Sequence, residues 1–132
     1  MKTKMKKINT YSDKTGDLVP ISLKDNIPFK TKRIFIIHGK KNHFRADHAH
    51  YKCSQYLLPL SGTIIVNYQN KKGKFKKILS FKKNNGLLLR PMTWCKIKFN
   101  FINSKLIVFC DKEYDPSDYI RNYKEFLTMI GK

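Results

Sequence analysis

Short apolar segments separated by turns rich in glycine, asparagine and serine recur along most of the chain. The clearest segment interleaves Cys95, Ile97 and Phe99 with Lys96 and Lys98, the pattern of a strand that buries one face. The other segments have similar lengths and are bounded by similar turns. We therefore predict strands over residues 18–23, 33–38, 55–60, 63–68, 75–81, 86–90, 95–99 and 105–110.

The carboxy-terminal segment changes to a helical period. Pro116 lies near a helix start, Asp115 or Ser117 is placed to cap it, and Gly131 follows the last apolar residue. This pattern predicts one amphipathic helix that closes an all-β fold, a small jelly-roll barrel or sandwich. The length of 132 residues suits a single domain over residues 1–132. The apolar positions of the predicted helix are Tyr119, Ile120, Tyr123, Phe126, Leu127 and Ile130.

The large positive net charge does not by itself indicate a nucleic-acid-binding protein. The chain has 28 Lys+Arg against 9 Asp+Glu, a formal net charge of +19, while its 41% hydrophobic residues exclude a disordered basic tail. Only four of the basic residues are arginine, the residue favoured for phosphate and guanine contacts. A dense lysine cluster flanks Gly73 at a predicted hairpin, and no nucleic-acid reading motif accompanies it. We predict no specific nucleic-acid partner.

Export and membrane insertion are not indicated. The longest apolar runs fall far short of the ~20 residues that span a bilayer, and the amino-terminal lysines precede no apolar signal region. Cys53, Cys95 and Cys110 show no C-x-x-C spacing, so neither a disulfide framework nor a zinc site is expected. The sequence predicts a cytoplasmic protein with no membrane contact and with reduced, mostly buried thiols.

The stretch that carries chemistry contains two closely spaced histidines. His48 and His50 are two residues apart, so on a strand their side chains share one face, which in a small barrel can be the interior. Two imidazoles in one pocket suit proton transfer near neutral pH. Asp47 lies between Ala46 and His48, is expected on the opposite face, and is assigned no role.

His48, His50 and Gly62 resemble the first motif of the cupins. In that family a carboxylate would stand where this chain has Gln55, and a last histidine would stand near Lys96. A protonated lysine offers no lone pair and repels a cation. We therefore predict that no metal is bound.

A narrower resemblance, to the sugar nucleotide 3,4-ketoisomerases of the FdtA/QdtA, WxcM-like group, spans most of the chain. It is carried by the R-x-x-H-A-H stretch from Arg45 to His50 and by the D-Y-I-R-x-Y tail from Asp118 to Tyr123. The resemblance implies a cupin-type fold and a cofactor-free isomerisation of dTDP-4-keto-6-deoxyhexose to the 3-keto sugar, used in deoxyamino sugar biosynthesis. It also implies a homodimer in which the amino-terminal strand pairs with the partner.

The resemblance implies roles for individual residues. His48 and His50 are the candidate catalytic pair, and which of them is the base stays open. The family usually has Gly where Ala46 stands, and its active-site tyrosine has no evident counterpart on the preceding strand. The candidate substrate-binding residues are Arg33, Arg45, Lys52, Gln55, Trp94 and Lys96.

Two alternatives are kept. One is a related metal-free cupin that epimerises a nucleotide sugar, which product NMR would distinguish. The other is a non-catalytic sugar or nucleic-acid binding module with vestigial histidines. A steep salt dependence of DNA binding, without turnover of a sugar, would favour this alternative.

Overall fold

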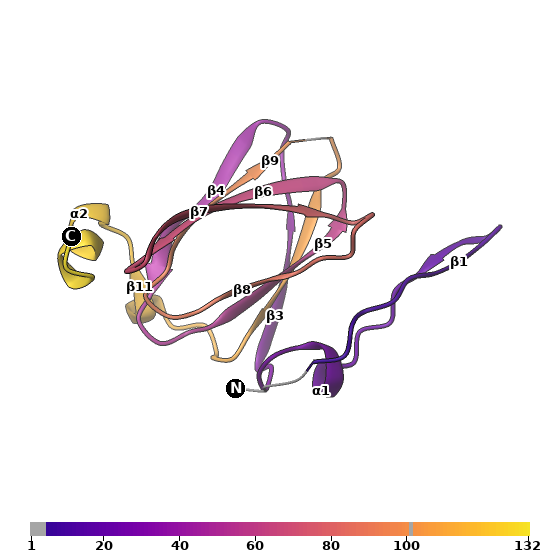
Figure 1. Ribbon diagram of the computed structural model, residues 1–132, viewed down its shortest axis with the longest axis horizontal. Coiled ribbons are helices and arrows are strands. Elements are labelled where there is room, and N and C mark those ends of the chain that lie inside the picture. Colours follow the sequence, from indigo (N-terminus) through magenta and orange to yellow (C-terminus); the bar gives the residue numbers. More distant parts are fainter. Residues whose placement is uncertain (1–4, 101) are drawn as a thin grey trace.

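Two antiparallel sheets facing each other form the body of the protein. A computed structural model describes residues 5–100 and 102–132 (Figure 1). One sheet has the strand order β3-β10-β5-β8 and the other β11-β4-β9-β6-β7, while β1 and β2 form a separate hairpin. The elements in chain order are β1 (Tyr11–Asp13), β2 (Gly16–Leu18), α1 (Leu23–Asn26), β3 (Arg33–His38), β4 (His43–His50), β5 (Gln55–Ser61), β6 (Thr63–Asn70), β7 (Gly73–Ser80), β8 (Leu87–Leu89), β9 (Trp94–Phe99), β10 (Lys105–Cys110), a 3₁₀ turn (Pro116–Asp118), β11 (Tyr119–Ile120) and α2 (Tyr123–Met129).

The core lies between the sheets because the inward-facing positions of the central strands are apolar. Ile97 and Phe99 of β9 are buried against residues of β5, β6 and β10, whereas Lys96 and Lys98 lie on the outer face above Phe44. The alternation predicted for this strand is confirmed. The mainly β fold with one main helix is also confirmed.

Two sequence-based predictions are wrong. Residues 18–23 do not form a strand: β2 ends at Leu18, and α1 begins at Leu23. The helix predicted from Pro116 is interrupted, because Tyr119 and Ile120 pair with β4 as β11. Helix α2 begins only at Tyr123. Its N-cap is Asn122, whereas Asp115 caps the preceding 3₁₀ turn.

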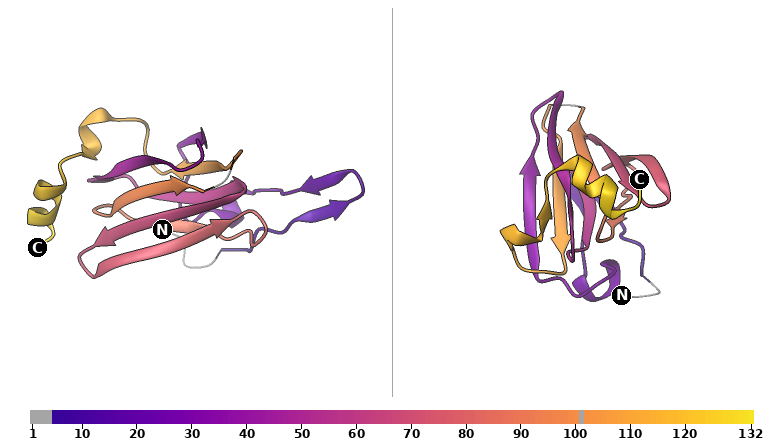
Figure 2. Two further views of the ribbon diagram at one scale, coloured as in Figure 1. Left: turned by 90° about the horizontal axis from the view of Figure 1, so that it is seen from above. Right: turned by 90° about the vertical axis from the view of Figure 1, so that its left-hand side faces the viewer.

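The β1–β2 hairpin and helix α2 lie at opposite ends of the molecule (Figures 1 and 2). The β1–β2 hairpin projects away from the sheets, and α2 lies at the far side of the molecule (Figure 2). Phe126 and Ile130 bury Trp94 on the outside of the larger sheet. In the described part of the chain, no helix is long and apolar enough to cross a bilayer.

Candidate active site

A cleft of about 580 Å³ extends into the space between the sheets. Its apolar lining comes from β3 and from residues of β4, β5, β9 and β10, and its polar side chains come from β3, β4, β5 and the segment that contains β11. Three of the predicted site residues line it together, namely His48, Arg45 and Gln55. The structure adds Tyr114, Tyr119 and Arg121.

The two histidines meet as the strand spacing predicts. Their ring centroids lie 5.1 Å apart at an interplanar angle of 88°, and the ring of Tyr119 lies 5.0 Å from His48 and 4.3 Å from His50. His48 borders the cleft, whereas His50 is buried behind it. Burial, followed by the charges of a protonated His50 and of Arg121, lowers the pKa of His48 to about 4. His48 is therefore a neutral imidazole at neutral pH, the form that accepts a proton.

The lowered pKa of His48 makes the folded state sensitive to acid. An unfolded histidine takes up a proton below about pH 6.5, whereas folded His48 resists it down to about pH 4, so stability falls as the pH decreases across this interval. We expect a loss of about 1.5 kcal/mol between pH 6.5 and 5 from this group. Thermal unfolding of the wild type and of His48→Asn at both pH values measures it. The variant should lose less stability than the wild type, and equal losses would contradict the assignment.

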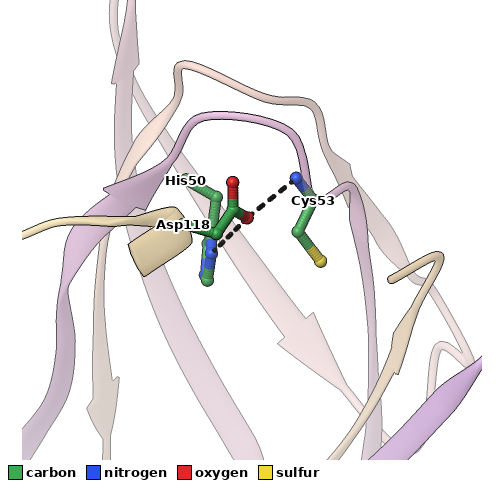
Figure 3. A group of neighbouring side chains, drawn as sticks. All are labelled: His50, Cys53 and Asp118. Atoms are coloured by element: carbon green, nitrogen blue, oxygen red, sulfur yellow. Dashed lines mark hydrogen bonds and ion pairs between the residues drawn. The ribbon is translucent and has the colours of Figure 1, made fainter. Parts of the chain in front are cut away.

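The carboxylate of Asp118 lies next to the imidazole of His50. Asp118 Oδ2 lies 3.4 Å from His50 Nδ1 and accepts a hydrogen bond from the backbone N–H of Cys53, at 3.1 Å (Figure 3). Its other oxygen accepts the backbone N–H of Lys52, at 2.8 Å. Burial lowers the pKa of His50, and Asp118 opposes that shift. The carboxylate therefore orients His50 and offsets part of the lowering of its pKa.

The Cys110 thiol contacts two further residues of the predicted site, Arg33 and Gln55. Cys110 Sγ accepts hydrogen bonds from Arg33 and from Gln55 Nε2, at 3.5 and 3.6 Å. A hydrogen bond from Cys53 and the charge of Arg33 lower the pKa of Cys110. Arg33 also lies over the ring of Tyr114. All three cysteines are buried and none is in a disulfide, as predicted.

The remaining predicted substrate contacts lie elsewhere. Lys52 lines a separate surface pocket beside Asp115 and Asp118. Trp94 and Lys96 line another, on the outer face of the larger sheet. The structure thus does not bring these three residues together with His48.

The donor atoms do not fit the metal cage of a cupin. Lys96, at the position of the last histidine, points to the outer face. The amide N–H of Gln55 is donated to Cys110, and an amide is a weak substitute for the carboxylate. His50, Cys53 and Asp118 offer ligand atoms within 4.8 Å of one another. However, the Asp118 oxygens already accept two backbone N–H groups. A hydrogen bond with Cys110, followed by burial, raises the pKa of Cys53, which disfavours its thiolate.

Sequence reasoning missed the residues that the tail supplies. Asp118, Tyr119 and Arg121 belong to the D-Y-I-R stretch, whose apolar spacing indicated a helix. The short β11 instead lays Tyr119 opposite His50 on β4, and Arg121 stacks over the Tyr119 ring at 4.4 Å. The signal that could have indicated a role in the site is the family resemblance itself, which is carried by the D-Y-I-R-x-Y tail as well as by the stretch that contains His48 and His50.

Two antiparallel sheets with an H-x-H strand facing the cleft between them define a cupin-type protein. The FdtA family model, described as WxcM-like, C-terminal, matches residues 1–131, and the chain belongs to this family.

Named relatives agree with this family. The chain is 31% identical over 135 aligned positions to the TDP-4-oxo-6-deoxy-alpha-D-glucose-3,4-oxoisomerase of Aneurinibacillus thermoaerophilus, covering 100% of this chain and 95% of the relative. QdtA, a sugar 3,4-ketoisomerase from Thermoanaerobacterium thermosaccharolyticum solved with TDP, has a TM-score of 0.84 and 30% identity over 94% of this chain and 90% of QdtA. A His-to-Asn variant of QdtA was solved with TDP-4-keto-6-deoxyglucose. A 3,4-ketoisomerase from Helicobacter canadensis has a TM-score of 0.83 and 30% identity over 96% and 95% of the two chains.

Proposed function

We propose that this chain is a 3,4-ketoisomerase that converts a TDP-4-keto-6-deoxyhexose into the 3-keto isomer. The observation that carries the proposal is the neutral His48 at the cleft, paired with His50, in a chain whose relatives bear that activity in their names. We further propose that residues 1–132 form one cytoplasmic catalytic domain. The reaction is an internal redistribution of hydrogen and needs no net oxidant.

The reaction requires a base beside C3 of the sugar. The C4 ketone acidifies the C3 hydrogen, and His48 takes it as a proton to give an enediolate with a hydroxyl on C3 and the negative charge on the C4 oxygen. The proton of the C3 hydroxyl passes to the C4 oxygen, and a proton from the histidine pair is added to C4, which leaves a ketone at C3 and a hydroxyl at C4. The developing negative charge on the oxygens needs donors already in place. Tyr119 lines the cleft against both imidazoles and is the proposed donor in place of the family's tyrosine.

The nucleotide diphosphate needs cations at the mouth of the cleft. Arg45 and Arg121 line the cleft, and Arg33 lies beside Tyr114 at its edge. Guanidinium groups bind phosphate oxygens with paired N–H donors. The net charge of +19 adds a positive field that speeds the encounter with an anionic substrate.

Substitution of Arg45 distinguishes direct binding of the diphosphate from attraction by the overall positive charge. Arg45→Ala is expected to raise KM about tenfold with little change in kcat, because a charge-assisted contact contributes about 1.5–3 kcal/mol. Lys77→Ala removes the same charge from an exposed position on β7 and should leave KM nearly unchanged. Steady-state kinetics of both variants test this, and equal effects would show that only the net charge matters.

We propose a homodimer built through the amino-terminal hairpin. This hairpin projects from the body (Figures 1 and 2) and leaves Tyr11 59% and Leu18 65% exposed. Strand β3 is the edge of its sheet and exposes Ile34 and Ile36. A second copy would cover this surface. Light scattering should give twice the mass of the chain, and a monomer at micromolar concentration would contradict the proposal.

Incubation with TDP-4-keto-6-deoxyglucose, followed by NMR of the product, tests the function. We expect the ketone to move from C4 to C3, and the configuration at C4 identifies the stereochemical course. Unchanged substrate with folded protein, or a product epimerised with its ketone still at C4, would reject the proposal.

A further inference from the structure

The strand that carries the histidines contains a bulge beside His48. Arg45 pairs with Ile97, Ala46 with Lys96 and His48 with Cys95, so two residues of β4 stand opposite one of β9. Ala46 and Asp47 have φ angles of 67° and 71°, in the left-handed region that is unfavourable for residues with a Cβ atom.

The bulge is what places Arg45 and His48 in the same cleft. On a regular strand, residues three apart point to opposite faces, so Arg45 facing inward would turn His48 outward. The extra residue resets the alternation. His48 is then aligned with Cys95, whose side chain belongs to the core between the sheets.

One side-chain hydrogen bond fastens this bulge on the outer face. Trp94 Nε1 donates to Asp47 Oδ1 at 3.0 Å. Trp94 is only 7% exposed and is fixed by α2, with the rings of Tyr123 and Phe126 at 5.2 and 5.4 Å. A buried, packed indole is therefore a rigid anchor for an otherwise unfavourable backbone.

We propose that Asp47 and Trp94 are positioning residues for His48: their hydrogen bond holds the bulge that aims the imidazole into the cleft. The catalytic part of this inference rests on the proposed ketoisomerase function. It assigns a role to Asp47, which was given none because it was expected on the opposite face of the strand from His48. It also gives Trp94 a role on the outer face in place of a substrate contact.

Kinetics of four variants test the inference. Trp94→Phe keeps an aromatic ring but removes the donor, Asp47→Ala removes the acceptor, and Asp47→Asn retains an acceptor oxygen. We expect the first two to lower kcat about tenfold with KM within about twofold, because a small displacement of a catalytic group is costly. The double variant Trp94→Phe/Asp47→Ala should lose no more than either single variant, since both break one bond. Asp47→Asn should recover most of the rate.

A matched control uses the same face of the sheet. Tyr123→Phe removes the hydroxyl that donates to Gln69 Oε1 without touching Asp47, and it should retain the wild-type kcat. Wild-type kcat in both single variants, losses that multiply in the double variant, or a raised KM with unchanged kcat would overturn the inference. The last result would indicate a substrate contact.

NMR of the histidine rings separates this inference from the proposed function. Without substrate, the His48 imidazole signals should move in Trp94→Phe and Asp47→Ala more than those of exposed His43, and remain in place in Tyr123→Phe. Unmoved His48 signals would reject the positioning role. A wild-type protein that fails to turn over the sugar while these shifts appear would reject the ketoisomerase proposal alone.

Discussion

Replacement of His48 by asparagine is expected to lower kcat by about 10²–10⁴, the usual contribution of a general base. Asparagine is close to histidine in size and polarity but cannot take a proton at neutral pH. KM should change little, because His48 contributes chemistry more than binding. Stopped assays of the TDP-sugar product measure the effect.

His43→Asn is the matched control for this substitution. His43 lies on the same strand, β4, but is exposed, and among the described residues its imidazole hydrogen-bonds only with the backbone oxygen of Lys41. It should keep the wild-type rate. A His48→Asn protein that is folded and as active as the wild type would remove the base from the mechanism.

Replacement of Asp118 by alanine is expected to lower both activity and stability. The change leaves His50 without its carboxylate and leaves the N–H groups of Lys52 and Cys53 without an acceptor. Loss of charge-assisted hydrogen bonds of this kind costs about 1.5–3 kcal/mol each, and we expect kcat to fall about 10–100-fold. Denaturant unfolding and steady-state kinetics measure the two effects.

The variant Asp111→Ala is the control that separates the loss of activity from the loss of stability. Asp111 accepts the backbone N–H of Ser54 at 2.8 Å, in the same loop, but has no described contact with either imidazole. It should lower stability while leaving kcat nearly unchanged. If Asp111→Ala and Asp118→Ala reduced kcat equally, Asp118 would be a loop anchor and not an orienting group for His50.

The parts of the fold set by local periodicity were predictable. The strand at Cys95 to Phe99 buries alternate residues as its sequence indicates, and the lysine cluster around Gly73 does flank a hairpin. The interruption of the terminal helix was not predictable in this way. Its cause is non-local, since Tyr119 and Ile120 exchange helical hydrogen bonds for pairing with a strand about 70 residues earlier.

The site was predictable where residue spacing alone decides geometry. His48 and His50 follow from the strand period, whereas Trp94 and Lys96 were assigned to the substrate although they lie on the opposite face of their sheet. The bulge explains why Arg45 and His48 share the cleft in spite of their odd spacing. No local sequence pattern reveals which of two neighbouring residues a bulge will include.

Solvent hydrogen exchange tests the central claim, that His48 moves the C3 proton, most directly. Wild-type enzyme and TDP-4-keto-6-deoxyglucose are incubated in D₂O and followed by ¹H NMR. We predict that the wild type consumes the C3 proton signal and forms the 3-keto sugar with deuterium at C4, while His48→Asn leaves the C3 signal intact over the same time. Loss of the C3 proton at the wild-type rate in His48→Asn would contradict the account.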